Sequence, residues 1–293
     1  MARVVYKPGE GRLSNYLYIL PACLIIGTFF ISSAIFTAYI SFFEWNGFSA
    51  MKFAGLNNYL NFFKDPNLVT SASNTFIWVV LHLVTSILIP LFFAILITNS
   101  SFLSYFKYIF YLPSALSSAV GSVIIGNLVG KYGIPKLLGL MGFHNLDFDW
   151  LLEPYVNTFV MIGSGIWASL GFNMLLFIIG LRSMPQDPVE SALIDGANVF
   201  QRYFKVIFPM LNHVFRLVFL HSLVNSFKIF DTIWILTKGG PFRSSETLAI
   251  SMYVESFLYN RLGQGAAVAM VLSVAIIFLT FFQMKNSISR EQE

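Results

Sequence analysis

The chain contains 293 residues, of which 56% are hydrophobic and 11% are charged, and its formal net charge is +4. Soluble domains have about 25% charged residues, so the composition excludes an ordinary water-soluble protein. The single cysteine, Cys23, excludes an intrachain disulfide and a cysteine-based metal site. The sequence has no basic cluster interleaved with aromatic residues, which argues against nucleic-acid binding. The lipid bilayer is therefore the expected environment.

Long runs without Asp, Glu, Lys or Arg follow one another along the chain, and a membrane helix needs about 20 apolar residues. The first run is longer than the core of a secretory signal and lacks a small-residue cleavage site, so we expect it to remain as a span. The fifth apolar stretch contains Arg216, Lys228 and Asp231, which makes it the most costly one to place in lipid. We predict one all-α integral membrane domain, residues 1–293, with six transmembrane helices at 17–43, 72–98, 108–130, 154–181, 209–237 and 262–284.

An even number of spans puts both termini on one side of the membrane, together with the loop 182–208. The segments on that side contain nine Lys or Arg residues, including Arg3, Lys7 and Arg12, against seven on the other side. Because basic residues concentrate on the cytoplasmic side, this bias predicts cytoplasmic termini.

The loop 182–208 is a polar insert in an otherwise apolar chain. Asp187 is expected to be the N-cap of a short helix, with Pro188 at the first position and Glu190 completing a capping box. This helix should run from Val189 to Asp195 and end at Gly196, which can adopt the left-handed conformation.

A second helical stretch, from Asn198 to Phe208, follows in the same loop. Phe200, Phe204 and Phe208 recur every four residues and therefore lie on one face of a helix. We expect this apolar face to lie on the membrane bundle, while the preceding short helix projects outward.

The loop resembles the EAA loop of the permease subunits of binding-protein-dependent ATP-binding cassette (ABC) importers. The pattern of that family is Glu-Ala-Ala, three residues, Gly, nine residues, Ile, any residue, Leu-Pro. Glu190, Ala192, Gly196 and Pro209 match it in register, while Ser191, Val206 and Phe208 replace Ala, Ile and Leu. Other stretches resemble the carbohydrate branch of the family: 53–59, 227–234, 238–241 and 246–248.

The resemblance implies a type I ABC importer permease-like bundle in the plasma (inner) membrane of a prokaryote. It implies a second homologous permease subunit, two cytoplasmic ATPase subunits and an extracytoplasmic solute-binding protein as partners. The residues that it places in contact with the ATPase are Glu190, Ser191, Ala192, Asp195 and Gly196. The expected solute is a carbohydrate, such as an oligosaccharide, although phosphorylated glycerol derivatives use similar permeases.

The chain itself is expected to bind no cofactor. It lacks the Gly-rich phosphate-binding loop with its Lys-Ser/Thr ending, so ATP and Mg should be held by the partner ATPase subunits.

Polar residues inside the spans are candidates for a translocation path. His221, Asn225, Lys228 and Thr232 recur at helical spacing on one face of the fifth span, and Asn173 lies near the middle of the fourth. A polar seam between packed helices is the competing interpretation. Lys228 and Asp231, three residues apart, are expected to neutralise each other.

Stripes of small residues mark the third and fourth spans. The residues at every fourth position, Ser114, Ser118, Ser122 and Gly126 in one span and Gly165 and Ser169 in the other, predict close helix packing. His82 is interpreted as a core histidine with its hydrogen bonds satisfied.

Two other classes of protein fit the sequence less well, although a secondary transporter or channel could also have six spans and a polar stripe. An ion-coupled secondary transporter or channel would have no use for the insert, and ion coupling usually leaves carboxylates in mid-membrane. An intramembrane enzyme would need a nucleophile with its base, a carboxylate pair or a metal cluster, and the four histidines show no ligand spacing. The resemblance to importer permeases therefore remains the favoured interpretation, and it implies a non-enzymatic permease subunit that imports its solute by alternating access.

Overall fold

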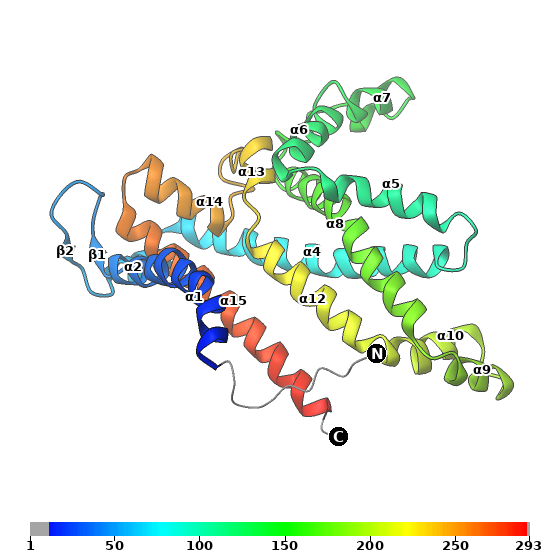
Figure 1. Ribbon diagram of the computed structural model, residues 1–293. Coiled ribbons are helices and arrows are strands. Elements are labelled where there is room, and N and C mark those ends of the chain that lie inside the picture. Colours follow the sequence, from blue (N-terminus) through cyan, green and yellow to red (C-terminus); the bar gives the residue numbers. More distant parts are fainter. Residues whose placement is uncertain (1–11, 292–293) are drawn as a thin grey trace.

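The computed structural model describes residues 12–291, and it is almost entirely helical (Figure 1). Arg3 and Lys7, two of the charges used for orientation, lie outside these residues. Two-residue strands β1 and β2 pair antiparallel near one end, with Glu44 opposite Lys52. The elements are α1 (Arg12–Ile25), the π-helix η1 (Ile26–Ile31), α2 (Ser32–Ile40), β1 (Phe43–Glu44), β2 (Lys52–Phe53), α3 (Asn57–Lys64), α4 (Pro66–Ile97), α5 (Leu103–Ala115), α6 (Ser118–Val129), α7 (Ile134–Leu140), the 3-10 helix η2 (His144–Leu146), α8 (Val156–Ser183), α9 (Asp187–Ile194), α10 (Val199–Arg202), the π-helix η3 (Tyr203–Ile207), α11 (Phe208–Met210), α12 (Asn212–Phe227), α13 (Asp231–Leu236), α14 (Leu248–Tyr253), the π-helix η4 (Val254–Leu258) and α15 (Leu262–Glu291).

Four helices among the described residues are long and apolar enough to cross a membrane: Tyr18–Ile40, Pro66–Ile97, Val156–Ser183 and Leu262–Gln283. Two further pairs of helices pass the same test together but are sharply bent, which gives up to six spans if each pair counts as one. Two residues fix the start of the long helix α4. The Asp65 side chain caps it by accepting a hydrogen bond from the Asn67 amide at 2.9 Å, and Pro66 occupies the first turn.

The third predicted span, 108–130, is not one helix. α5 ends at Ala115, α6 begins at Ser118, and the chain bends by 102° between them. The Ser117 side chain caps α6 by accepting from the Val120 amide at 3.3 Å. The expectation of a continuous helix is therefore wrong here, because an uncharged composition does not report where the backbone turns.

The fifth predicted span, 209–237, is also interrupted. The chain bends by 71° between Met210 and Asn212, and α12 stops at Phe227 before α13 begins at Asp231. The unwound residues 228–230 fall where the sequence carries Lys228 and Asp231. A break in mid-bundle is tolerated where it lines a cavity, and this one does.

The core of the bundle forms around α4 and α8, with α12 beside them (Figure 1). One buried cluster joins the loop after α9 to the bundle, since Ile207 and Leu211 pack with Met174 and Phe177 of α8. Glycines allow the close approaches that this packing needs: a Cβ at Gly180 would meet the Val214 side chain at 2.5 Å, and one at Gly126 would meet Leu236 at 2.8 Å. The predicted small-residue seam at Gly126 is confirmed.

The segment between α13 and α14 lies far from α9 and is firmly anchored (Figure 1). Asn157 donates to the Gly240 carbonyl at 2.9 Å, and Asn74 donates to the Glu246 carbonyl at 3.0 Å. Arg243 pairs with the buried Glu246 carboxylate, and this bond raises the pKa of the arginine. The loop is thus held in one conformation, with Phe242 fully exposed at its surface.

Candidate functional site

The short helix α9 projects from the bundle at the end of α8 (Figure 1). It closes with two hydrogen bonds typical of a helix C-terminus, from the Gly196 amide to the Leu193 carbonyl at 3.1 Å and from the Ala197 amide to the Ala192 carbonyl at 2.9 Å. Gly196 adopts a φ of +77°, in the left-handed region. The predicted termination of this helix at Gly196 is confirmed.

The predicted capping box at the start of α9 is wrong. Gln186 is the N-cap, no side chain caps the helix there, and Asp187 is already its first residue. A capping box does occur one helix later, where Asn198 accepts from the Gln201 amide and the Gln201 side chain accepts from the Asn198 amide, both at 2.9 Å. The box therefore orders the chain leaving α9.

The predicted packing of three phenylalanines on the bundle fails for two of them. Phe200 and Phe204 are 76% and 64% exposed, and Tyr203, Ile207 and Phe208 make the contact instead. Residues 203–207 form a π-helix, whose wider turn changes which side chains face the bundle. A pattern counted at 3.6 residues per turn cannot anticipate that change.

The predicted coupling residues occupy the outer surface of α9. Glu190, Ser191, Asp195 and Gly196 are exposed, whereas Ala192 is half-buried toward the bundle. Sequence reasoning missed the two apolar residues beside them: Ile194 is 86% exposed and Leu193 is also exposed. Two large apolar side chains on so short a projecting helix indicate a contact surface for another protein. The signal was available, because both lie between Ala192 and Asp195 within the motif.

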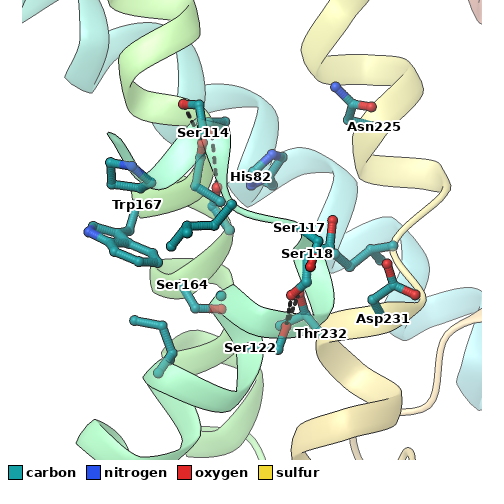
Figure 2. Close-up of a pocket in the computed structure, with 18 of the residues that line it drawn as sticks. His82, Ser114, Ser117, Ser118, Ser122, Ser164, Trp167, Asn225, Asp231 and Thr232 are labelled. Carbon is teal, nitrogen blue, oxygen red and sulfur yellow. Dashed lines mark hydrogen bonds between the residues drawn. The ribbon is translucent and has the colours of Figure 1, made fainter. Parts of the chain in front are cut away.

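A cavity of about 430 Å³ lies between α4, α5, α6, α8, α12 and α13, beside the break between α5 and α6 and beside the unwound residues 228–230. Figure 2 shows His82 of α4, Ser114 of α5, Ser164 of α8 and Asn225 of α12 around it. Hydroxyl groups dominate the wall near the break between α5 and α6. Four serines line the cavity there: Ser114, Ser117, Ser118 and Ser122.

The cavity brings together four of the five residues predicted for a translocation path. His221, Asn225, Lys228 and Thr232 all line it. They do so on an interrupted helix, so the predicted single helical face does not extend to Thr232. Thr232 instead reaches the cavity from α13 and accepts a hydrogen bond from Ser122 at 3.2 Å (Figure 2).

Lys228 and Asp231 do not neutralise each other as expected. Both side chains are exposed and line the cavity, and within residues 12–291 no ion pair joins them. One positive and one negative charge are therefore both available at the wall.

Asn173, the fifth predicted residue, lies behind the wall and does not line the cavity. It is completely buried and bonds to Ser86, Ser222 and His221. His82 also departs from expectation: it is buried and stacks on Trp78 with ring centroids 6.4 Å apart, but its Nδ1 has no hydrogen-bond partner among the described residues.

The serines predicted to pack helices together also line the cavity. Ser114 donates to the Ala168 carbonyl at 2.8 Å, which joins α5 to α8, and it also lines the cavity. Trp167 and Tyr111 also line the cavity and were not singled out from the sequence. Within residues 12–291 no group of three His, Cys, Asp or Glu side chains is arranged to hold a metal ion.

A second polar cavity, of about 670 Å³, lies where the β1–β2 loop meets the start of α15. Glu255 of η4 is 2% exposed in its wall, and its Oε2 lies 3.6 Å from Nη1 of Arg261. Burial raises the pKa of the Glu255 carboxyl group, and the nearby Arg261 opposes that shift only in part.

This shift predicts how stability depends on pH. Because the folded state holds the Glu255 proton more tightly than the unfolded state, the stability of the folded state falls as pH rises from the ordinary carboxyl pKa through the raised one. We expect Glu255→Gln to unfold at a higher temperature than the unmodified protein above that range. Thermal unfolding in detergent from acidic to neutral pH measures this, and an equal difference at every pH would contradict it.

The chain resembles known transport proteins over most of its length. No protein-family model matches it. It is 35% identical over 260 residues to a probable ABC transporter permease protein of Pyrococcus horikoshii, covering 87% of this chain and 89% of that protein. It is 28% identical over 282 residues to the arabinooligosaccharides transport system permease protein AraP of Bacillus subtilis, covering 94% and 89%.

The fold resembles that of a solved bacterial ABC transporter involved in the import of the acidic polysaccharide alginate. The TM-score is 0.80 at 18% sequence identity, and the match covers 95% of this chain and 96% of that chain. The chain thus shares the fold of a subunit of that transporter and has several helices long and apolar enough to cross a membrane.

The chain belongs to the permease proteins of ABC transporters. The predictions of an all-α permease fold and of a transport subunit that is not an enzyme are confirmed by this membership.

Proposed function

We propose that this chain is one of two permease subunits of an ATP-driven importer, and that it moves a carbohydrate into the cytoplasm by alternating access. The observation that carries the proposal is the continuity between the projecting helix and the cavity. α9 follows α8 after only three residues, and α8 and α12 both contribute to the cavity wall. A displacement of α9 therefore reaches the cavity through two rigid helices.

The packing supports this transmission. Ile207 and Leu211, in the chain between α9 and α12, are buried in the same cluster as Met174 and Phe177 of α8. Closely packed side chains cannot absorb a displacement without moving their neighbours. The loop and the two helices should consequently shift together, tilting the walls on which His221 and Asn225 lie.

The partners follow from surfaces that this chain leaves uncovered. The exposed Leu193 and Ile194 of α9 suit a groove on a cytoplasmic ATPase subunit, and two such subunits would bind the ATP and Mg. Asn225, Lys228 and Asp231 are exposed at the cavity, so a second, homologous permease is proposed to close it. This arrangement puts α9 and both termini in the cytoplasm and directs Phe242 toward an extracytoplasmic solute-binding protein.

The choice of a carbohydrate rests on the chemistry of the wall and on the relatives. Serine and threonine hydroxyls, amides and aromatic rings such as Trp167 are groups that bind sugar hydroxyls and sugar faces. One curated relative is named for arabinooligosaccharides and another for multiple sugars.

Reconstitution tests the proposal. The chain would be placed in proteoliposomes with a candidate second permease, ATPase and solute-loaded binding protein, and uptake of radiolabelled arabinotriose or maltotriose would be followed. Uptake should require ATP and should stop when any one component is omitted. Uptake that continued without the ATPase, driven by an ion gradient, would falsify the importer in favour of a secondary carrier.

A further inference from the structure

Asn173 connects three helices from a position that no solute can reach. Its side chain is completely buried on α8. Its amide nitrogen donates to the Ser86 carbonyl of α4 at 2.8 Å and to the Ser222 hydroxyl of α12 at 3.1 Å. Its amide oxygen lies 3.1 Å from Nδ1 of His221. All the polar atoms of this side chain are therefore engaged.

The surroundings leave one orientation for the Asn173 amide. The Ser86 backbone carbonyl can only accept a hydrogen bond, so the atom that faces it at 2.8 Å must be the amide nitrogen. The amide oxygen then faces His221. Reversing the amide would set two oxygens against each other in a buried site and leave both without a donor.

This orientation determines where His221 carries its proton. The Asn173 oxygen has no proton to give, so Nδ1 of His221 must be the donor. A neutral imidazole carries one such proton, which leaves Nε2 as an acceptor. The ring is held in place by Phe172, whose centroid lies 4.5 Å away.

A further hydrogen bond connects His221 to Asn225 at the cavity wall. Nε2 of His221 lies 2.9 Å from the side-chain amide of Asn225, and because Nε2 accepts, the facing atom is the Asn225 amide nitrogen. Asn225 is exposed at the wall, and no other hydrogen bond engages its side chain within the described residues. Its carbonyl oxygen and one N–H are therefore left for a solute at the cavity wall, where Figure 2 shows the Asn225 side chain.

We infer that Asn173 and His221 are positioning residues, which make the outward edge of Asn225 a binding subsite for two neighbouring hydroxyl groups of an uncharged sugar. The inference rests on the proposed import function. One hydroxyl donates to the Asn225 oxygen while the next accepts from its N–H. A carboxylate or phosphate offers only acceptors, so the Asn225 oxygen disfavours an anionic solute at this point.

The position of the proton can be measured without any transport. Nitrogen NMR of the complex with 15N-labelled histidine should find His221 protonated at Nδ1, with its signal assigned by its loss in His221→Gln. In Asn173→Leu the proton should move to Nε2, which allows the Asn225 amide to reverse. A wild-type ring protonated at Nε2 would overturn the inference.

Transport supplies the second readout. For ATP-driven uptake of arabinotriose or maltotriose, Asn173→Leu should raise the KM about tenfold, the effect of losing one good hydrogen bond, and Asn225→Ala, which removes both hydrogen bonds, should raise it by at least as much. Asn225→Ala should leave the proton of His221 on Nδ1. Because Asn225 is exposed, this variant remains informative even if Asn173→Leu fails to fold. Unchanged KM values in Asn225→Ala, or preferred uptake of a trimannuronate over both neutral sugars, would contradict the subsite.

Asn157 offers a matched control on the same helix. It is equally buried and likewise donates to a backbone carbonyl and a serine hydroxyl, those of Gly240 and Ser244, at 2.9 and 3.1 Å. Asn157→Leu should lower the unfolding temperature without changing the sugar KM or the His221 signal; a KM raised as much as in Asn173→Leu would count against a specific positioning role. If the proton lies on Nδ1 but no sugar is taken up with ATP, the import function fails rather than the hydrogen-bond geometry.

Discussion

Replacing Ile194 with aspartate is expected to abolish binding of the ATPase subunits while leaving the membrane bundle intact. The Ile194 side chain is 86% exposed, so its loss removes almost no contact from the fold. Burying an isoleucine side chain at an interface contributes about 1.5 to 3 kcal/mol. Losing that contribution corresponds to a reduction in affinity of about ten- to a hundredfold, before the cost of burying a carboxylate is added.

The measurement is the amount of ATPase that co-purifies with the permease, compared with the thermal unfolding of the permease alone. Phe242→Asp is the matched control, because Phe242 is 96% exposed on the loop far from α9. Ile194→Asp should lose the ATPase with an unchanged unfolding temperature, whereas Phe242→Asp should retain it. Equal retention in both variants would mean that Ile194 does not contact the ATPase.

Introducing a single methyl group at Gly171 is expected to separate α5 from α8. A Cβ at this position would lie 2.2 Å from the Phe110 carbonyl oxygen and 2.5 Å from the Tyr111 Cα. Both are backbone atoms, so no rotamer change relieves the clash and the helices must move apart. Overpacking of this kind typically costs about 1 to 3 kcal/mol. Because Ser114 of α5 lines the cavity, ATP-driven uptake should fall together with stability.

Gly163 on the same helix provides the control, since a Cβ there meets nothing within 4 Å. Gly163→Ala should be neutral or slightly stabilising, because alanine favours a helix over glycine by about 1 kcal/mol. Thermal unfolding in detergent compares the two variants. If Gly171→Ala were as stable as Gly163→Ala, the close approach of α5 and α8 would be incorrect.

Hydrophobic composition predicted the membrane environment and the neighbourhood of the main helices, while the permease class was predicted only by the resemblance to the EAA loop. The long α4, α8 and α15 lie close to the predicted spans, because a run of apolar residues long enough to cross a bilayer has few alternatives to a helix. Gly196 ends α9 as expected, since a glycine next to a helix C-terminus readily adopts a positive φ. These are local properties that a sequence expresses directly.

The breaks that shape the cavity depend on tertiary structure and were not anticipated. Between α5 and α6 the sequence offers only Pro113 and the capping Ser117, in a run without charges. The charged pair Lys228 and Asp231 was noticed, but as neutralising partners rather than as an unwound segment. Four of the five residues predicted for the path do line the cavity, but the sequence did not predict the backbone that presents them. Asn173 is the clearest example, because burial gives it a supporting position behind the wall instead of one on it.

In the proposed importer, α9 contacts an ATPase while the opposite end of the bundle faces the solute-binding protein. Photo-cross-linking tests it most directly, with a photoreactive amino acid placed at Ile194 in one sample and at Phe242 in another, within the assembled importer in membrane vesicles. Ile194 is expected to cross-link to the ATPase subunit and Phe242 to the solute-binding protein. Cross-links from Ile194 to lipid or to the binding protein alone would contradict it.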